Sequence, residues 1–430
     1  MWKIEPPLQN KAGVLHIGNV STIKLGDKFG TPLYVTDENR IRENYSRISE
    51  SFKKNYQNFS LNYAIKANNN LSVLKILKSM GSGADCSCKE EIMLAKKTGF
   101  PPSDIIYTGN YNSDQELKYA LQNRVIINLD DISLLPKLLQ LGIPKMISFR
   151  VNPGLGKGRY SGLVFGGKKT KFGIGESDVI KGYELAKKAG VTKFGIHMMA
   201  GSAILDVNYF RDITEKLLVI AGKIVKKVGI EFEFVNLGGG FGISYRPRER
   251  DLNIVKVGKE VGMLFKRRVD ELSLGNPTLM IEPGRYIVGD STILLAKVHS
   301  IKRVKGRTTY VGTDAGMNTL LRPALYGAYH QTYVANRLDS KRAEIVNICG
   351  QICENTDIIA EYRKMSRMKE GDLIAVLNAG AYGFAMSSQY NSRPRAAEVL
   401  VRDGITDLIR KRETVSDLVR HQTVPGRLGK

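Results

Sequence analysis

The stretch Leu61-Asn62-Tyr63-Ala64-Ile65-Lys66-Ala67-Asn68 is an apolar run that closes on a lysine. A lysine at a strand end usually extends its ammonium into solvent. If the ammonium is partly desolvated instead, its pKa falls and it becomes a nucleophilic amine that can hold a carbonyl cofactor as a Schiff base. The stretch alone favours the solvated lysine, and the second interpretation rests on the pattern of the whole chain.

That pattern is an alternation of short apolar or β-branched runs with segments of helical spacing. It follows a helix expected over residues 38–53, capped by Thr36-Asp37. Eight runs are expected to be strands: 61–66, 83–85, 105–108, 125–128, 146–152, 193–197, 232–237 and 278–281. Helical segments are expected over 71–78, 89–97, 113–122, 134–139, 178–188, 209–228 and 255–272. Eight β-α units over about 240 residues predict a TIM barrel.

The pattern of the sequence changes after Arg285, where strand-like runs have few helical segments between them. These runs are 293–298, 308–311, 343–348 and 373–377, and two more lie near the start of the chain, at 14–17 and 32–35. The tail over 405–430 is charged and rich in turn residues. We therefore predict an α/β chain with a (β/α)8 barrel over 37–283 and a mostly β domain made of 1–36 and 284–430.

The composition limits the classes of function. The chain has 430 residues and a formal charge of +23, but its lysines and arginines are spread out and mixed with acids. This favours anionic small molecules over nucleic acid, although non-specific binding of nucleic acid stays open. We see no signal-peptide core and no apolar run long enough to span a bilayer.

The four cysteines, Cys86, Cys88, Cys349 and Cys353, form no disulfide framework in a chain of this length, which suits the cytoplasm. Their spacings differ from the usual C-x-x-C, so a zinc site is disfavoured and no metal is predicted.

Unusual residues follow most of the expected barrel strands. The clusters are Lys66-Ala67-Asn68, Asp85, Asn152-Pro153-Gly154, the segment His197 to Ser202, Gly238-Gly239-Gly240 and Glu282-Pro283-Gly284-Arg285. Because the segments after the strands of a TIM barrel meet at one rim, we expect these residues to converge. The triple glycine, with Gly201-Ser202, lets backbone N–H groups approach a phosphate. Glu282 either forms a salt bridge or holds a proton on a heterocyclic nitrogen.

The second domain carries polar groups of its own. Arg322 and Tyr326 form a plausible carboxylate clamp, although Pro323 leaves open whether they share one helical face. Cys353 stands beside Glu354 and is either an acid/base group or a small apolar residue of the interior.

Taken together, and with Gly30-Thr31-Pro32-Leu33-Tyr34 near the start of the chain, these motifs resemble the fold-type III pyridoxal-phosphate decarboxylases. Within that group the chain is similar to the diaminopimelate decarboxylases over nearly its whole length. The resemblance implies decarboxylation of meso-2,6-diaminopimelate to L-lysine and CO2, the last step of lysine biosynthesis. It also implies a homodimer with shared active sites, in the cytoplasm.

The resemblance implies roles toward the cofactor, pyridoxal 5'-phosphate. Lys66 would form the Schiff base, Ser202 and Gly238–Gly240 would bind the phosphate, and Glu282 would keep the pyridine nitrogen protonated. Further positions implied to contact or support the cofactor are Asp85, Met199, Gly284, Arg285 and Tyr382.

It also implies roles toward the substrate. Arg285, Arg322 and Tyr326 would hold carboxylate, Glu354 would read the distal ammonium, and Tyr382 would touch both substrate and cofactor. Cys353 of the partner subunit would protonate the α-carbon. A substrate without a distal carboxylate would leave the arginines unpaired, at a cost on the order of 1–3 kcal/mol. That favours a dicarboxylic diamino acid over the alternatives, which are ornithine, arginine or a carboxylated polyamine.

Two positions depart from the family pattern. Met199 stands where the family has a histidine that stacks on the cofactor ring, and Cys88 stands where it has a serine. Methionine can pack on an aromatic face but cannot ionise. Met199 therefore leaves open a shifted substrate, or a relative that has lost catalysis, against which Lys66, Glu282 and Cys353 argue.

Overall fold

The computed structural model describes residues 4–154, 156–159, 166–167, 170–303 and 308–429. Its contacts divide the chain into two compact units. The barrel unit comprises Ile41–Ser244 and Glu249–Val288, and the β-rich unit comprises Met1–Arg40, Tyr245–Arg248 and Gly289–Lys430. The domain boundaries predicted from the sequence, 37–283 for the barrel, remain a prediction, because a division by contacts does not test which segments fold alone.

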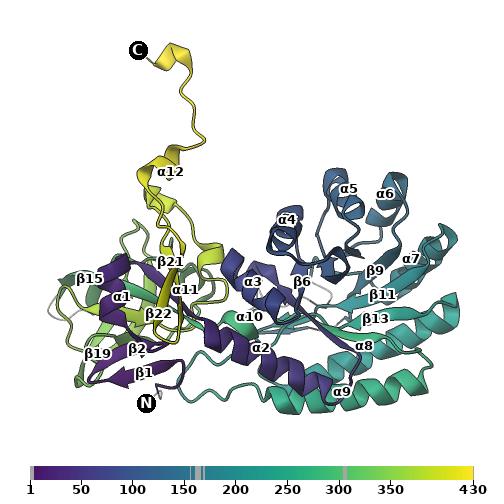
Figure 1. Ribbon diagram of the computed structural model, residues 1–430, viewed down its shortest axis with the longest axis horizontal. Helices are drawn as coiled ribbons and strands as arrows, with labels where there is room; N and C mark the ends of the chain where they lie inside the picture. The colour runs from purple at the N-terminus through teal and green to yellow at the C-terminus, as the bar shows by residue number, and fades with distance from the viewer. Residues whose placement is uncertain (1–3, 155, 160–165, 168–169, 304–307, 430) are drawn as a thin grey trace. The chain divides into compact units, whose positions relative to one another are not determined.

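The barrel unit is a closed ring of eight parallel strands with helices outside it (Figure 1). The ring runs in the order β11-β13-β14-β5-β6-β7-β8-β9. The strands are β5 (Phe59–Ala64), β6 (Gly83–Cys86), β7 (Ile105–Tyr107), β8 (Ile126–Leu129), β9 (Met146–Val151), β11 (Lys193–Met198), β13 (Phe232–Asn236) and β14 (Thr278–Ile281). The predicted TIM barrel is confirmed, and each of the eight predicted strands overlaps one of these.

The helices of the barrel unit follow the predicted order. They are α3 (Leu71–Ser79), α4 (Lys89–Thr98), α5 (Asp114–Gln122), α6 (Leu134–Leu141), α7 (Glu176–Lys188), α8 (Val207–Val228), α9 (Ile254–Glu271) and the short α10 (Arg285–Val288). Helix α2 (Glu38–Lys53) matches the predicted helix over 38–53 and leads into the barrel. A short strand pair, β10 (Lys157–Gly158) with β12 (Gly201–Ser202), lies outside the ring.

One predicted strand end was wrong in a way that matters for the site. Strand β5 ends at Ala64, and Lys66 lies on the 3-10 turn η1 (Ile65–Ala67) rather than in the strand. The N–H of Ala64 donates to the carbonyl of Pro283, 3.4 Å away, and the chain enters the turn directly after this contact. The turn places the lysine at the rim.

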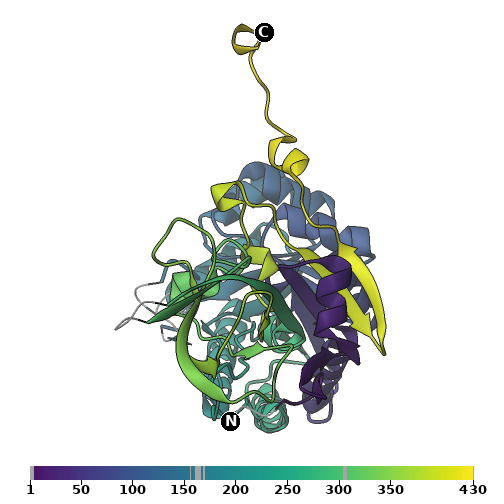
Figure 2. The same cartoon turned by 90° about the vertical axis from the view of Figure 1, so that its left-hand side faces the viewer.

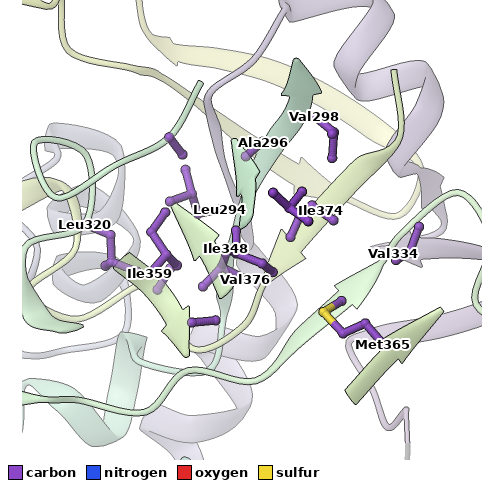
Figure 3. Packing of buried hydrophobic residues seen from close by; sticks show 14 of the residues in the cluster. Leu294, Ala296, Val298, Leu320, Val334, Ile348, Ile359, Met365, Ile374 and Val376 are labelled. Atoms are coloured by element: carbon purple, nitrogen blue, oxygen red, sulfur yellow. The ribbon is translucent and has the colours of Figure 1, made fainter. Parts of the chain in front are cut away.

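The β-rich unit is a sheet in the order β19-β18-β16-β15-β4-β21-β22, with β20 pairing β15 and β17. Its strands are β4 (Leu33–Asp37), β15 (Thr292–Lys302), β16 (Thr309–Thr313), β17 (Thr332–Val334), β18 (Arg342–Cys349), β19 (Ile358–Ser366), β20 (Leu373–Val376), β21 (Ala397–Arg402) and β22 (Ile405–Arg410). β4, from the start of the chain, pairs with both β15 and β21, so the N-terminal segment completes this sheet. Figure 3 shows one of its cores, where Leu294, Ile348 and Val376 pack together.

The N-terminal segment also forms a small sheet and a helix. The sheet comprises β1 (Leu8–Lys11), β2 (Val14–Ile17) and β3 (Val20–Ser21), and α1 (Thr22–Phe29) follows it. Helix α1 lies against β2, in purple in the view of Figure 2. The expectation of strands alone in this segment was wrong, because Ser21 caps the helix by accepting from the N–H of Ile23 at 3.2 Å.

In the described part of the chain eight strands were missed: β1, β3, β10, β12, β17, β19, β21 and β22. Charged side chains interrupt β19 and β22, which are edge strands with mostly exposed or half-buried residues. The tail also holds the short helix α12 (Val415–Val419). No helix in the described part of the chain is long and apolar enough to cross a membrane.

Candidate active site

The strand ends of the barrel unit bring charged residues from distant parts of the chain together. The order β11-β13-β14-β5-β6 makes five strands consecutive around the ring. The residues within two positions of their carboxyl ends include His197, Asn236, Glu282, Lys66 and Asp85. Three of these, Lys66, Asp85 and Glu282, were predicted to be site residues, and the structure brings them to one rim.

Lys66 is ion-paired with Asp85. The lysine side chain is 41% exposed while that of Asp85 is 1% exposed, so the carboxylate is fixed and the amine is accessible. The second carboxylate oxygen of Asp85, Oδ1, is buried and has no hydrogen-bond partner among the described residues. Burial raises the pKa of Asp85, as does the charge of Glu282, whereas Lys66 lowers it.

Glu91 lies in the first turn of α4 and accepts a hydrogen bond from the N–H of Ser87 at 2.6 Å. Burial raises its pKa, and the charge of Lys66 opposes that rise. The residue therefore adds a second carboxylate to the surroundings of the lysine.

Glu282 is held by two neighbours. His197 Nε2 lies 3.1 Å from Oε2, and Asn236 Nδ2 donates to Oε1 at 2.7 Å. Burial of Glu282 opposes ionisation, but His197, Lys66 and Asn236 outweigh it, and the net pKa of Glu282 is lowered. The carboxylate is therefore charged at neutral pH and fixed in orientation. His197 Nδ1 is buried without a partner among the described residues.

The glycine run Gly238–Gly240 lies where no side chain fits. A Cβ on Gly238 would stand 2.4 Å from the carbonyl oxygen of Met198, and one on Gly239 would stand 2.5 Å from that of Glu282. The run thus packs its backbone directly on the neighbouring strand ends. Gly284 is similar, because its Cβ would stand 2.8 Å from that of Ala67, on the turn that carries the lysine.

Met199 lies against the same run. Its sulfur is 3.3 Å from the N–H nitrogen of Gly239 and 3.2 Å from the position of a Cβ on Gly238. The sulfur takes the place of an acceptor for a backbone N–H group, so this methionine is part of the rim rather than a loose surface side chain.

Two further buried charges near the rim were missed by the sequence analysis. Arg150, in β9, donates to Asp130, just after β8, at 2.9 Å, and both side chains are less than 8% exposed. Burial lowers the pKa of Arg150, and the charge of Asp130 only partly opposes this. The available signal was a charged residue inside the apolar run 146–152, and the polar residue Asn236 offered a similar signal in the run 232–237.

In the β-rich unit, Arg322 and Tyr326 are the first and last residues of helix α11 (Arg322–Tyr326). Pro323 occupies the first turn, where its missing N–H costs no hydrogen bond, so it starts the helix rather than breaking it. Arg322 is buried, its guanidinium lies 4.7 Å from the ring centroid of Tyr245, and its Nη1 is 2.9 Å from Nε2 of His330.

The same unit carries the predicted cysteine and its neighbours. Cys353 is exposed, which rules out the alternative of a small interior residue, and its sulfur lies 3.1 Å from Nδ2 of Asn391. Glu354 accepts a hydrogen bond from the hydroxyl of Tyr390 at 2.5 Å. Tyr382 follows β20 and has a positive φ of 57°. All four cysteines are free thiols.

The sequence and the fold were compared with known proteins. Residues 39–289 match the family model described as pyridoxal-dependent decarboxylase, pyridoxal binding domain. This chain belongs to the pyridoxal-dependent decarboxylase family. Within the family it is similar to the diaminopimelate decarboxylase of Methanothermobacter thermautotrophicus, with 47% identity over 97% of this chain and 98% of the relative. The diaminopimelate decarboxylase of Archaeoglobus fulgidus is 40% identical over 96% of this chain and 98% of the relative.

A solved structure of the diaminopimelate decarboxylase of M. jannaschii in complex with L-lysine is also similar in fold. Its TM-score is 0.88 with 32% identity, and the match covers 98% of each chain. Members of this family use pyridoxal phosphate, so the residues described above must supply hydrogen-bond donors for the cofactor and leave space for it.

The rim residues fit that cofactor. The hydroxyl of Ser202 and the N–H of Gly240 have no hydrogen-bond partner in the described part of the chain; Gly240 ends the glycine run and packs on Gly201, the neighbour of Ser202. An accessible amine, a free amide and hydroxyl for a phosphate, and an ionised carboxylate for a ring nitrogen are the groups that pyridoxal phosphate requires.

Proposed function

We propose that this enzyme is a diaminopimelate decarboxylase, which converts meso-2,6-diaminopimelate to L-lysine and CO2. The observation that carries the proposal is the 47% identity to a diaminopimelate decarboxylase over nearly the full length of both chains. The barrel rim supports it, because Lys66, Asp85 and Glu282 lie on consecutive strand ends.

The cofactor site is assigned to residues of the barrel unit. Lys66 would bind the aldehyde carbon, Ser202 and Gly238–Gly240 would bind the phosphate, and Glu282 would face the pyridine nitrogen. When bound, the cofactor supplies an electron sink for the electron pair that remains as CO2 leaves.

Glu282 has the properties that this role needs. Its carboxylate is ionised and both of its oxygens are held, one by His197 and one by Asn236. A fixed negative charge favours a proton on a facing ring nitrogen, and it acts strongly because water is excluded from it. The buried carboxylate of Asp85 pairs with the ammonium of Lys66 and holds it in place.

The carboxylate clamp is assigned to Arg322 and Tyr326 of α11, with Arg285 at the start of α10. Packing on Tyr245 and contact with His330 fix the guanidinium of Arg322 in one orientation, which reduces the entropy lost on binding a carboxylate. Glu354 would bind the distal ammonium, and Tyr382 would contact substrate and cofactor.

We also propose a homodimer in which Cys353 of the partner subunit delivers the proton to the α-carbon. The exposure of Cys353 supports this role, since a proton donor that serves a neighbouring subunit must lie at the surface of its own. The four free thiols support a reducing compartment, and we propose the cytoplasm.

A substrate panel tests the proposed reaction. We expect kcat/KM for meso-diaminopimelate to exceed that for ornithine, arginine and a carboxylated polyamine by about 10²-fold or more, because the latter leave the arginine clamp unpaired. A preference for any of those three would refute the substrate assignment while leaving the cofactor site intact.

A further inference from the structure

The β-rich unit contains a cavity of about 460 Å³ that the proposed reaction does not use. Its polar lining comes from Arg246, from Tyr329 after α11, from the loop that follows Glu354, and from β19. The polar residues are Arg246, Tyr329, Asn355, Thr356, Glu361 and Arg363.

The cavity adjoins the segments that build the proposed carboxylate clamp, because Pro323 and Ala324 of α11 also line it. Tyr245 and His330 contact each other, at 5.2 Å between ring centroids, and Tyr245 carries Arg322 on its ring. Their sequence neighbours Arg246 and Tyr329 instead line the cavity. The cavity therefore shares α11 with the clamp, but the clamp residues Arg322 and Tyr326 do not line it.

Two guanidinium groups meet the ring of Tyr329 in this cavity. The carbon at the centre of the Arg363 guanidinium lies 3.5 Å from the ring centroid, and that of Arg246 lies 4.9 Å from it. Arg363 is half-buried, its Nη2 contacts the carbonyl of His330 at 3.4 Å, and its Nε has no partner among the described residues. Burial lowers the pKa of Arg363, and the charge of Arg246 adds to that effect.

Both guanidinium groups are cations that share one ring, and a bound anion would offset their mutual repulsion. Glu361 is the one carboxylate among the lining residues, so the formal charge of the lining is positive. Asn355 and Thr356 add an amide and a hydroxyl, which are hydrogen-bond donors for oxygen ligands.

We propose that this cavity binds a small oxyanion of the phosphate class, held by Arg246 and Arg363 with Asn355 and Thr356 as further donors. Guanidinium forks match the geometry of phosphate oxygens, and a dianion compensates two cations better than a monocarboxylate does. The source is either inorganic phosphate or the phosphate group of a metabolite.

An effect on turnover follows, and this part alone rests on the proposed function. Asn355 and Thr356 come directly after Cys353 and Glu354 in the chain. A phosphate that contacts Asn355 and Thr356 restrains the loop that carries Cys353 and Glu354. The binding of phosphate and the binding of substrate are therefore coupled. We expect phosphate to lower KM for diaminopimelate.

The direct test is calorimetric titration of inorganic phosphate into the enzyme loaded with pyridoxal phosphate, so that the phosphate group of the cofactor fills the glycine run. Ionic strength is held constant with chloride. We expect saturable binding of one phosphate per chain, weakened about tenfold or more in Arg246→Gln. Lys364→Gln is the matched control, because Lys364 is the exposed neighbour of Arg363 on β19 and does not line the cavity.

Arg246 is chosen because it is exposed, so its loss should leave the fold intact, which a melting curve checks. A second titration with glycerol phosphate separates the sources: binding of the ester as well as of phosphate supports a metabolite, and binding of phosphate alone supports the free ion. Absence of saturable binding, or equal affinity in Arg246→Gln and Lys364→Gln, would overturn the proposal.

Discussion

Glu282 shows how a buried carboxylate stays charged in a barrel. Its burial alone would raise the pKa, yet His197, Lys66 and Asn236 bring it below the ordinary value.

We expect Glu282→Gln to retain the cofactor but to reduce kcat by about 10²–10³-fold, because the fixed charge opposite the ring nitrogen is lost. Steady-state kinetics and the cofactor absorbance measure the two effects. Glu233→Gln is the control, because Glu233 forms an exposed ion pair with Lys193. Full activity in Glu282→Gln would show that the mechanism does not need this carboxylate.

Met199 tests what the missing histidine means. Its sulfur contacts the N–H of Gly239, so we interpret it as a packing residue of the cofactor site. We expect Met199→Leu, which nearly conserves volume, to keep cofactor affinity within about threefold, and Met199→Ala to weaken it about tenfold. Fluorescence titration with pyridoxal phosphate measures both. Equal loss in the two variants would mean that the sulfur, and not the packing, is what the site requires.

Single residues were predictable where their chemistry contrasts with their surroundings. Lys66, Asp85 and Glu282 are charges that close apolar runs, and the structure places them on neighbouring strands. The pairing of His197 with Glu282 was not predictable, because it joins residues 85 positions apart through barrel closure. The pairing of Arg150 with Asp130 was not predictable either, because it joins β9 to the residue just after β8, the neighbouring strand.

At the scale of the elements, the departure from the family pattern at Cys88 lowers the stability of helix α4. Cys88 occupies its N-cap position, with no hydrogen bond from the side chain to the first turn. By contrast, Ser113 caps α5 in a complete capping box. We expect Cys88→Ser to raise the free energy of unfolding by about 1 kcal/mol, and Ser113→Ala to lower it by a similar amount. Urea unfolding measures both, and a Cys88→Ser variant less stable than wild type would contradict the account.

Elements with a regular hydrophobic pattern were predictable from the sequence, and strands at the edge of a sheet were not. The barrel strands are buried on both faces, so they appear as continuous apolar runs. β22 is half-exposed and contains Asp407 and Arg410, which makes it look like a loop in the sequence. Helix α1 has Gly26 in its interior, which weakened the helical pattern that Ser21 starts.

At the scale of the whole molecule, stability should depend on Asp37, at the junction of β4 and α2. Burial raises its pKa to about 6 from an ordinary value near 4. The folded state therefore binds this proton more tightly than the unfolded state does, and stability from this group is present below pH 4 and lost as pH rises through 6. We expect the wild-type protein to lose on the order of 1–2 kcal/mol of its free energy of unfolding between pH 4 and about 6.5 because of this group. Asp37→Asn should not show that loss. Urea midpoints across that range measure it, and parallel profiles for the two proteins would refute the assignment.

The proposed shared active sites make a second prediction at this scale. Lys66→Ala and Cys353→Ala should each be inactive or nearly so, but an equal mixture that exchanges subunits should regain about a quarter of wild-type activity, because half of the dimers then hold one intact site. Activity of the mixture against that of each variant alone is the measurement. No recovery, despite subunit exchange seen by mass spectrometry, would place Cys353 in the site of its own chain.

The measurement that tests the central claim most directly is a spectrum of the purified protein with pyridoxal phosphate, followed in the same cuvette by meso-diaminopimelate while L-lysine and CO2 are quantified. The account predicts a visible absorbance band from the lysine-bound cofactor, absent in Lys66→Ala, and equal amounts of L-lysine and CO2. A band that persists in Lys66→Ala, or a wild-type band with no L-lysine formed, would contradict it.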